Sequence, residues 1–548
     1  MPKGRLNHKF INMEMKKKIL TLLFCQIFVS CLFSQKNDSE KLAELFNFYE
    51  EQGLFNGSVL VSKGGHILLN GGYGHRDASK EIPNSSKSIF PIYSITKSFT
   101  STVILKLEEE EMLSLSDKLS KFYPDFPNAD DISIENLLTH TSGIYDYTKG
   151  NNMLDQTEES FVEFERTKPL DFPVGTEWSY SNSGYYFLGY IIKKVTGFSY
   201  EQAISRYILD PLNMRQSGFA FKNLIDENKA VGYKVLTERR QLESIVYDPP
   251  GPFAAGGLYS TVEDLQKFYQ GIKEYRLLNE ETLKKAYSPF KNNYGYGWII
   301  DSKFSKKTVG HSGAGAGFRS NFLQIPEDDT CIILLSNVEE DLVNITAGIL
   351  KIFYDQPYKI PLINIINVEN LRKYIGAYIV NEDFIIYVSI EDNRLIAQPK
   401  GQPKSILYPE NQNLFYVQEM NGYIHFEKNG QNLIDTLIIN NQGQTIKAKK
   451  INLPWGIVGS ATDHGWDGGD IELIKIMDKE IWKVYGVQLD TGEFQFRYNK
   501  DWTISLGQDK NHVLIENGEN IKVSNGIYDI TLDLTDYERP KYEILKIN

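Results

Sequence analysis

The chain contains very little cysteine, with three residues among 548. Two of them, Cys25 and Cys31, lie in an apolar segment near the N-terminus, so a chain cleaved after that segment keeps only Cys331. An internal disulfide is therefore excluded for the processed chain. Cys331 lies within the apolar run TCIILL at residues 330–335, which is typical of a buried strand. We expect it to be a small core residue rather than a nucleophile.

The sequence also has no excess of positive charge, and several familiar catalytic motifs do not occur in it. Lys and Arg number 59 against 71 Asp and Glu, the formal net charge is −12, and no long basic block occurs beyond the N-terminus. Because nucleic-acid binding needs a positive patch, we expect no nucleic-acid partner. The chain has no Gly-x-Ser-x-Gly, no His-Glu-x-x-His and no cysteine-rich metal spacing. We therefore expect neither an α/β-hydrolase nor a zinc peptidase, and no metal or cofactor.

A long apolar run occurs only near the N-terminus. Three consecutive lysines precede the apolar residues 19–33, and small and polar residues follow. This order is typical of a secretory signal, and the run is shorter and more interrupted than the roughly 20 apolar residues of a membrane-spanning helix. We predict a signal peptide over residues 1–34 with cleavage near Ser34. The mature chain is then exported, to the periplasm, the outer membrane or the medium, and has no transmembrane helix.

Two alternatives remain open for this segment: where translation starts, and whether Cys31 carries a lipid. The lysines begin directly after Met15, so Met13 and Met15 are alternative translation starts to Met1. Cys31 follows Val-Ser and partly fits a lipoprotein cleavage box, but Phe28 is a poor residue at the first position of that box. We therefore favour cleavage near Ser34 over lipidation of Cys31.

The remaining chain is long enough for several domains and rich in aromatic residues. Aromatic side chains make up 13% of it, which supplies a large core and favours β-structure. A hairpin pattern over residues 57–69 and three strand-like segments within 308–337, with helices between them, indicate one sheet assembled from both ends of a domain. Beyond residue 358, short alternating strands recur with Asn and Gly turns. We predict a mixed domain at 36–358, a small β-rich module at 366–451 and a β-sandwich module at 454–548.

The first segment that suggests chemistry is Ser94-Ile95-Thr96-Lys97. Apolar residues recur at helical spacing from Ile95 to Leu107, and Pro91 suits the first turn of a helix. Ser94 and Lys97 then share a helical face, so their head groups can meet. A hydroxyl beside an amine at the positive end of a helix can form a serine nucleophile without a histidine. The motif alone is weak evidence, because Ser288-Pro289-Phe290-Lys291 has the same spacing.

Two further motifs follow in order along the chain. They are Tyr180-Ser181-Asn182 and, before a strand, His311-Ser312-Gly313. With the flanking phrases LLTHTSGI at 137–144 and AAGGL at 254–258, the chain resembles the serine hydrolases of the class C β-lactamase, DD-peptidase and esterase type. The resemblance implies an α/β (α+β) domain with an antiparallel sheet flanked by helices and an all-helical subdomain. It also implies a hydrolase that forms an acyl-enzyme on its serine.

The resemblance assigns catalytic roles. Ser94 would attack a carbonyl carbon, and the backbone N–H groups of Ser94 and Ala314 would form the oxyanion hole. A lysine normally titrates at about 10.4 and is protonated, although burial can lower that value. Lys97 is therefore either a neutral base or a cation that stabilises a deprotonated Tyr180. The sequence leaves both alternatives open, because the pair titrates as a coupled system.

Substrate-binding roles follow from the same resemblance. Asn182 would hold Lys97 and orient a substrate amide. His311 occupies the place of a lysine found in many β-lactamases, and it would donate to a substrate carboxylate or to Tyr180. Its charge would then vary near neutral pH. Ser312-Gly313 would line the site beside it.

The last module carries a second resemblance. Segments WGIVGSAT at 455–462 and GEFQFR at 492–497 resemble the β-sandwich repeat of outer-membrane starch-binding proteins. Trp466, Trp482 and Trp502 would then stack on sugar rings, as flat apolar faces with polar edges do. The alternative is that they are core and rim aromatics of the sandwich. The middle module resembles the small β-barrel appended to such hydrolases, and we assign it no chemistry.

Two functions are consistent with these patterns. The first is an exported serine hydrolase whose partner is a small-molecule or peptide acyl substrate: an ester, a D-amino-acid peptide or a β-lactam. The second is a surface protein that binds polysaccharide through its last module and whose hydrolase-like domain is inactive. The second rests on that module and on His311 in place of the more familiar lysine.

Overall fold

The computed structural model describes residues 36–547, apart from 151–156, 237–240, 245–252, 340–341, 357–359, 361–367, 382–383, 392–393, 400–401, 403, 419, 421, 442–443, 452–454, 476–479 and 537–538. The predicted signal peptide, with Cys31, lies outside the described residues. The chain divides into two compact units, Met1–Gln356 and Pro357–Asn548. None of the helices within the described residues has the length and apolar character that crossing a membrane requires.

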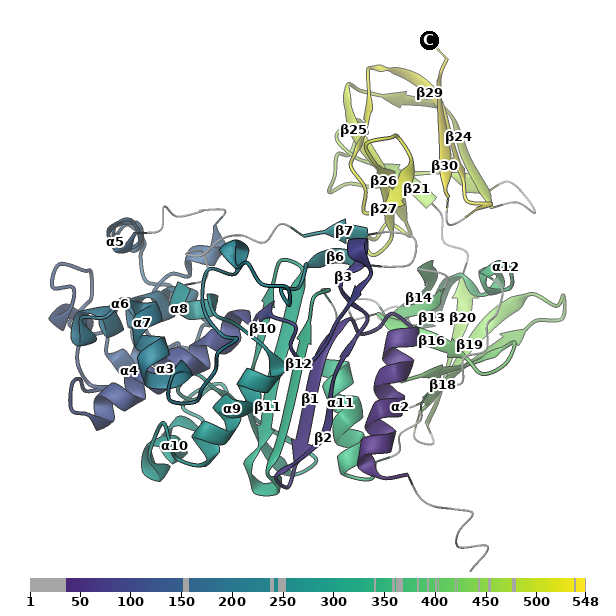
Figure 1. Ribbon diagram of the computed structural model, residues 1–548. Coiled ribbons are helices and arrows are strands. Elements are labelled where there is room, and N and C mark those ends of the chain that lie inside the picture. The colour runs from purple at the N-terminus through teal and green to yellow at the C-terminus, as the bar shows by residue number, and fades with distance from the viewer. Residues whose placement is uncertain are drawn as a thin grey trace, which may run out of the picture. The chain divides into compact units, whose positions relative to one another are not determined.

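A six-stranded antiparallel sheet forms the centre of the first unit (Figure 1), in the order β2-β1-β12-β11-β10-β9. Its strands are β1 (Gly57–Lys63), β2 (His66–Tyr73), β9 (Ile299–Lys303), β10 (Lys306–Gly315), β11 (Phe318–Ile325) and β12 (Thr330–Ser336). Val59 of β1 pairs with Leu334 of β12, so the two ends of the domain meet in the sheet as predicted. Every residue of β12 is buried, which confirms Cys331 as a core residue.

Helices cover both faces of this sheet. The helices of the unit are α2 (Asp38–Glu51), α3 (Thr96–Glu109), α4 (Ile134–Leu138), α5 (Glu158–Arg166), α6 (Asn182–Thr196), α7 (Tyr200–Ile204), α8 (Phe253–Gly256), α9 (Val262–Lys273), α10 (Glu280–Ala286) and α11 (Leu342–Phe353). Successive strand residues point to opposite faces. Phe322 of β11 contacts Phe268 of α9 at a ring distance of 6.1 Å, while its neighbour Asn321 donates to Thr346 of α11 at 2.7 Å. Helices α9 and α11 therefore lie on opposite faces.

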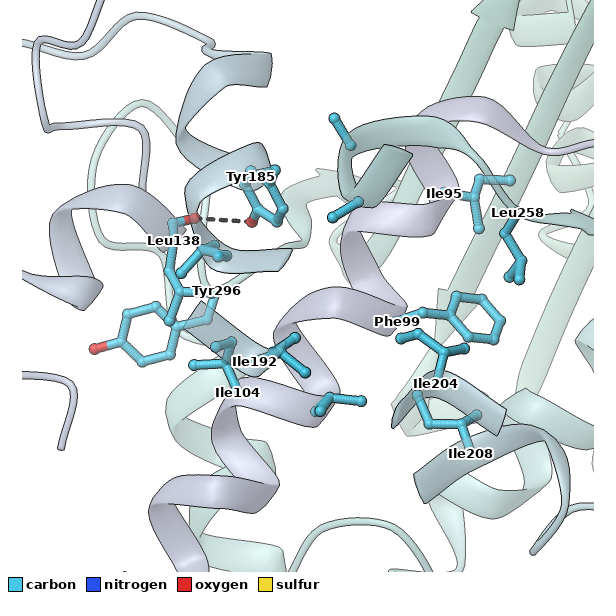
Figure 2. Packing of buried hydrophobic residues seen from close by; sticks show 14 of the residues in the cluster. Ile95, Phe99, Ile104, Leu138, Tyr185, Ile192, Ile204, Ile208, Leu258 and Tyr296 are labelled. Atoms are coloured by element: carbon cyan, nitrogen blue, oxygen red, sulfur yellow. Dashed lines mark hydrogen bonds between the residues drawn. The ribbon is translucent and has the colours of Figure 1, made fainter. Parts of the chain in front are cut away.

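A helical layer built around α3 completes the domain. Phe99 of α3 stacks on Phe268 with ring centroids 3.9 Å apart. Figure 2 shows Ile104 of α3 packed near Ile192 of α6, with the Tyr185 hydroxyl donating to the Leu138 carbonyl at 2.9 Å. Burying an aromatic or aliphatic side chain of this size stabilises the fold by about 1.5–3 kcal/mol. Because this packing fixes α3 against α6, it also fixes the residues that begin each helix.

The expected role of Pro91 in the first helical turn is wrong. Phe90–Pro91 is a short strand, β5, paired with β8 (Tyr259–Ser260), and a 3₁₀ turn at Tyr93–Ile95 leads into α3. Pairing with β8 holds the backbone of Pro91 extended, which a proline tolerates in a short edge strand. Two further short strand pairs belong to the unit: β3 (His75–Asp77) with β4 (Ile82–Pro83), and β6 (Tyr233–Leu236) with β7 (Gln241–Glu243).

The described part of the second unit is made mainly of strands, with a short helix, α12 (Val368–Leu371), and a 3₁₀ turn at Arg372–Tyr374. Eight strands form a closed barrel: β13 (Gly376–Asn381), β14 (Phe384–Glu391), β15 (Arg394–Pro399), β16 (Ser405–Pro409), β17 (Leu414–Val417), β18 (Gly422–Lys428), β19 (Ile434–Asn441) and β20 (Gln444–Ile451). Two further sheets follow. One contains β21 (Trp455–Val458), β22 (Ile471–Glu472), β25 (Gly492–Tyr498), β26 (Ser505–Gln508), β27 (Leu514–Glu516) and β28 (Ile521–Val523). The other contains β23 (Ile474–Lys475), β24 (Ile481–Leu489), β29 (Gly526–Asp533) and β30 (Lys541–Lys546), and the predicted fold class is thus confirmed.

Candidate active site

A cavity of about 400 Å³ lies where α3, α6, α8 and β10 meet in the first unit. Its lining residues are Tyr93, Ser94, Tyr147, Thr148, Tyr180, Asn182, Ala255, Gly256, His311, Ser312 and Ala314. The structure thus brings together most of the residues predicted for the site, although their motifs are far apart in the sequence. Lys97 and Gly313 are not among the lining residues, and both are buried.

The Ser94 and Lys97 head groups meet as the spacing predicts. Lys97 is fully buried, and its Nζ lies 3.1 Å from Ser94 Oγ. The same amine donates to Asn182 Oδ1 at 2.8 Å and to the Ala255 carbonyl at 2.8 Å. Two carbonyl oxygens therefore take two N–H groups, and the third position on the nitrogen faces the serine. In the neutral amine this position holds the lone pair.

The burial of Lys97 changes the pKa of its amine. Burial lowers the pKa of Lys97 to about 7, while the nearby carboxylate of Asp146 acts in the opposite direction. At neutral pH a large fraction of Lys97 is then a neutral amine. A neutral amine within hydrogen-bond distance of a serine hydroxyl can accept the proton of that hydroxyl.

Tyr180 lies close to the same pair. Its ring faces Lys97 Nζ, with 4.7 Å between the nitrogen and the ring centroid. Burial raises the pKa of Tyr180 well above its ordinary value, and its hydrogen bond with Ser94 offsets this only in part. The phenol therefore keeps its proton at neutral pH. Of the two alternatives that the sequence left open, this favours Lys97 as the base.

The expectation that His311 titrates near neutral pH is wrong. Burial lowers the pKa of His311 to about 3, and the positive charge of Lys97 contributes. The Nδ1 atom lies 2.6 Å from the Ser312 carbonyl, which only accepts hydrogen bonds, so Nδ1 carries the proton. The Nε2 atom lies 3.1 Å from the Tyr294 hydroxyl. His311 is neutral, and its partner is Tyr294 rather than Tyr180.

Asp146 is a residue of the site that the sequence reasoning missed. Its Oδ2 accepts hydrogen bonds from Asn182 Nδ2 at 3.1 Å and from the Asn182 backbone N–H at 3.3 Å. Its other oxygen accepts from the backbone and the hydroxyl of Thr148, which lines the cavity. Asp146 thereby turns the amide oxygen of Asn182 toward Lys97. The only available signal was its position two residues after the LLTHTSGI phrase.

The Ala255 carbonyl was missed for a related reason, because a backbone acceptor has no side-chain signature. Helix α8 is held against α3 by Thr100, whose hydroxyl donates to the Ala254 carbonyl at 2.7 Å. Thr96 Oγ1 accepts from the Leu258 N–H at 3.2 Å. These contacts hold the carbonyl of Ala255 over the amine of Lys97.

Close packing of β10 against the serine turn positions the predicted oxyanion hole. A Cβ on Gly313 would lie 2.2 Å from the Ile92 carbonyl and 2.4 Å from Ser320 Oγ, so only glycine allows this approach. Tyr93, directly before Ser94, has a φ of +44°, which is strained for a residue with a side chain. The strained turn and the close strand bring Ser94 and Ala314 to the wall of one cavity.

The second Ser-x-x-Lys sequence does not form a comparable pair. Ser288 donates its hydroxyl to the Lys284 carbonyl at 2.8 Å, and Lys291 binds the carbonyls of Gly175 and Thr176. The two head groups are therefore occupied by different partners. Spacing in the sequence is not sufficient without a helix to align the side chains.

The three tryptophans of the last module differ in exposure. Trp482 is only 8% exposed and packs in the sandwich core, which contradicts its expected role in stacking on sugars. Trp502 is 45% exposed, and its ring lies 5.9 Å from that of Trp466. The guanidinium of Arg497 lies 4.7 Å from the Trp502 ring centroid, and its Nε donates to Asp470 at 3.1 Å. Trp466 and Trp502 thus form a supported, partly exposed aromatic pair.

Comparison with known proteins agrees with this arrangement. The chain is similar to penicillin-binding protein 4* of Bacillus subtilis, with 28% identity over 427 residues that cover 72% of this chain and 94% of that protein. Its fold matches the octameric penicillin-binding protein homologue of Pyrococcus abyssi with a TM-score of 0.56 and 26% identity, over 75% of this chain and all of that one. The D-amino acid amidase of Ochrobactrum anthropi matches with a TM-score of 0.53 and 22% identity, over 58% and 99% of the chains, which shows a shared fold.

The sheet, the helical layer and a serine bonded to a buried lysine define the class of serine hydrolases with a β-lactamase fold. Residues 40–348, more than half of the chain, match the family model described as Beta-lactamase. The chain belongs to the beta-lactamase family. The resemblance of the last module to starch-binding repeats stays a prediction.

Proposed function

We propose that this protein is an exported serine hydrolase that forms an acyl-enzyme on Ser94. Its substrates would be esters, D-amino-acid peptides or amides, or β-lactams. The observation that carries the proposal is the 3.1 Å contact between Ser94 Oγ and the amine of Lys97, which is fully buried and has a lowered pKa. The name of penicillin-binding protein 4*, a relative aligned over most of its length, supports β-lactams as ligands.

In the first step, neutral Lys97 accepts the proton of the Ser94 hydroxyl while Ser94 Oγ bonds to the substrate carbonyl carbon. The carbonyl oxygen becomes an oxyanion, which the backbone N–H groups of Ser94 and Ala314 would bind. Asn182 and the Ala255 carbonyl hold Lys97 in place, and both can accept from the ammonium ion that forms.

In the second step, the tetrahedral adduct collapses and the bond to the leaving group breaks. The hydroxyl of Tyr180, which is protonated and bonded to Ser94, would donate its proton to the leaving atom and regain one from Lys97. This leaves the acyl-enzyme with Lys97 neutral again. A water molecule then attacks the acyl carbon, with the same groups accepting and returning its proton.

Export is part of this proposal. It is supported by the charged and apolar N-terminal segment. Fractionation of cells that express the full chain would locate it. A chain retained in the cytoplasm with its N-terminal segment intact would contradict export.

The catalytic proposal is tested by labelling with a fluorescent fluorophosphonate and a fluorescent penicillin, together with a panel of nitrophenyl esters, D-alanyl peptides and nitrocefin. We expect Ser94→Ala to abolish both labelling and turnover. Ser288→Ala is the matched control, because Ser288 belongs to the second Ser-x-x-Lys sequence and its hydroxyl binds a backbone carbonyl. Labelling that survives Ser94→Ala would refute the assignment of the nucleophile.

A second candidate function is polysaccharide binding by the last module. It is supported by the pair formed by Trp466 and Trp502, which Arg497 and Asp470 hold in place. Migration of the full chain in native gels with and without soluble starch would test it. Retardation that is lost in Trp502→Ala is expected, whereas equal migration in both gels would argue against this function.

A further inference from the structure

His140 is a buried residue that binds the chain on both sides of Tyr180. It lies two residues beyond the end of α4, and only 1% of it is exposed. Its backbone carbonyl accepts a hydrogen bond from the Ser179 N–H at 3.1 Å. Its Nδ1 accepts from the Ser181 N–H at 3.1 Å. The residues directly before and directly after Tyr180 are therefore both bound to His140.

The His140 ring also contacts the Tyr180 side chain. The centroids of the two rings are 4.5 Å apart, with an angle of 41° between their planes. The ring of Tyr294 has its centroid at 4.5 Å from that of His140 as well. The two backbone bonds thus fix the main chain at Tyr180, and the ring contact limits the rotation of its side chain.

His140 occupies this place at a cost in free energy. Its φ is +59°, in the left-handed region that residues with a side chain rarely adopt. Burial lowers the pKa of His140 well below its ordinary value, so the ring is neutral, and since Nδ1 accepts a hydrogen bond, Nε2 carries the proton. This Nε2 has no hydrogen-bond partner among the residues that the structure describes. A strained backbone and an unpaired buried donor are more typical of functional sites than of packing alone.

From these contacts we infer that His140 is a positioning residue, which holds the Tyr180 hydroxyl where it can donate its proton to the leaving group. His140 is not among the lining residues of the cavity, so it acts through Tyr180 and not on the substrate. In this step the bond between the carbonyl carbon and the leaving atom breaks, and the Tyr180 proton moves to the leaving atom. The ammonium group of Lys97 then returns a proton to Tyr180. This inference rests on the proposed function and deepens it.

Two esters of N-acetyl-D-alanine test the inference on the full chain, the 4-nitrophenyl ester and the ethyl ester. Nitrophenolate leaves as a stable anion, whereas ethoxide must be protonated as it leaves. The two esters give the same acyl-enzyme, so kcat/KM compares only the steps up to its formation. Acid release is followed with a pH indicator for both. The ratio of the nitrophenyl value to the ethyl value is unaffected by a substitution that slows both esters equally.

The variants differ in the hydrogen-bond acceptor at position 140. In His140→Asn the Oδ1 atom replaces Nδ1 as the acceptor, and asparagine tolerates a positive φ. In His140→Gly the positive φ is tolerated but the acceptor is lost, and His140→Phe keeps a ring without an acceptor. Tyr180→Phe gives the ratio without the proton donor. Tyr287→Phe is the control for a general loss of stability, because it removes a buried hydroxyl that donates to Gln324 at 2.9 Å.

We expect the ratio to rise by about tenfold or more in His140→Gly and in His140→Phe, because a displacement of about 1 Å within a site is costly. The rise should be in the same direction as in Tyr180→Phe, since the ethyl ester alone depends on the transferred proton. His140→Asn should restore the wild-type ratio. Tyr287→Phe should melt at a lower temperature than wild type and keep the wild-type ratio.

Several results would overturn the inference and leave the proposed hydrolase intact. One is an unchanged ratio in a folded His140→Gly or His140→Phe enzyme, or in Tyr180→Phe. Another is a ratio in His140→Asn as high as in the variants that have no acceptor. If neither His140→Gly nor His140→Phe folds, His140 serves the fold and the inference is wrong. If wild type cleaves neither ester faster than Ser94→Ala, the proposed function fails and the inference fails with it.

Discussion

Replacing Asp146 by asparagine should shift the pH dependence of the reaction. The carboxylate of Asp146 binds Asn182, which in turn binds Lys97, so a single amide group separates the two charges. Asp146 stabilises the ammonium form of Lys97 and thereby raises its pKa against the effect of burial. Asp146→Asn removes the negative charge but keeps the size of the side chain.

The size of the shift follows from this separation. Opposite charges about 8 Å apart attract by about 2 kcal/mol at an effective dielectric constant of about 20. Losing this attraction disfavours the charged amine, so the pKa of Lys97 falls below its present value of about 7. Because the neutral amine is the active form, kcat/KM rises with pH through this pKa. We expect the midpoint of that rise to move to lower pH by roughly one pH unit in the variant.

The assay is kcat/KM for a neutral ester between pH 4.5 and 9, since this parameter reports ionisations of the free enzyme. A lower plateau is also expected in Asp146→Asn, because the new amide NH₂ faces donors from Asn182 or Thr148. Asp171→Asn is the matched control: Asp171 pairs with Lys149 and does not act on Lys97. A midpoint that stays in place, or moves to higher pH, would refute the assignment of Lys97 as the neutral base.

Three other predictions concern stability, packing and the last module. Burial raises the pKa of Glu165 from 4.5 to about 8, so the folded state keeps a proton that the unfolded state loses, and stability should fall as pH rises between these values. Glu165→Gln should reduce this loss by about 1–3 kcal/mol, measured by thermal melts at pH 5 and pH 8. Glu163→Gln on the same helix should leave the loss unchanged. An equal loss of stability in wild type and in Glu165→Gln would contradict the prediction. Gly313→Ala should lower turnover at least about tenfold, since even small misplacements in a site are costly. Gly71→Ala is the control and should not lower turnover, because its added Cβ would have its nearest neighbour at 3.8 Å. A fully active Gly313→Ala enzyme would contradict the packing argument. Trp502→Ala should migrate in starch gels as it does without starch while keeping full esterase activity.

Local spacing made part of the site predictable. Ser94 and Lys97 are three residues apart at the start of a helix, so their contact follows from helical geometry. The second Ser-x-x-Lys sequence shows the limit of this reasoning, because its proline prevents the same geometry and its head groups bind elsewhere. Tyr180 and Asn182 entered the site through a resemblance of motifs, since the sequence contains no information on the distance between α3 and α6.

Other residues could not be predicted from the sequence. Asp146 acts through Asn182, and Ala255 acts through its carbonyl, so neither has a motif of its own. Trp482 looked like Trp502 in the sequence, yet one is in the core of the sandwich and the other is exposed. Which side of a strand or loop faces the core is decided by the partner sheet, and that partner is distant in sequence.

The sequence by itself determined much of the strand and helix pattern, the buried cysteine and the pairing of the proposed nucleophile with its lysine. These depend on periodicity and on neighbours within one or two helical turns. Only the tertiary structure decided the protonation states: the pKa of Lys97 is lowered to about 7, and His311 is uncharged at neutral pH. The reason is physical: a pKa depends on how completely a group is removed from water and on which charges surround it, and packing between distant segments sets both.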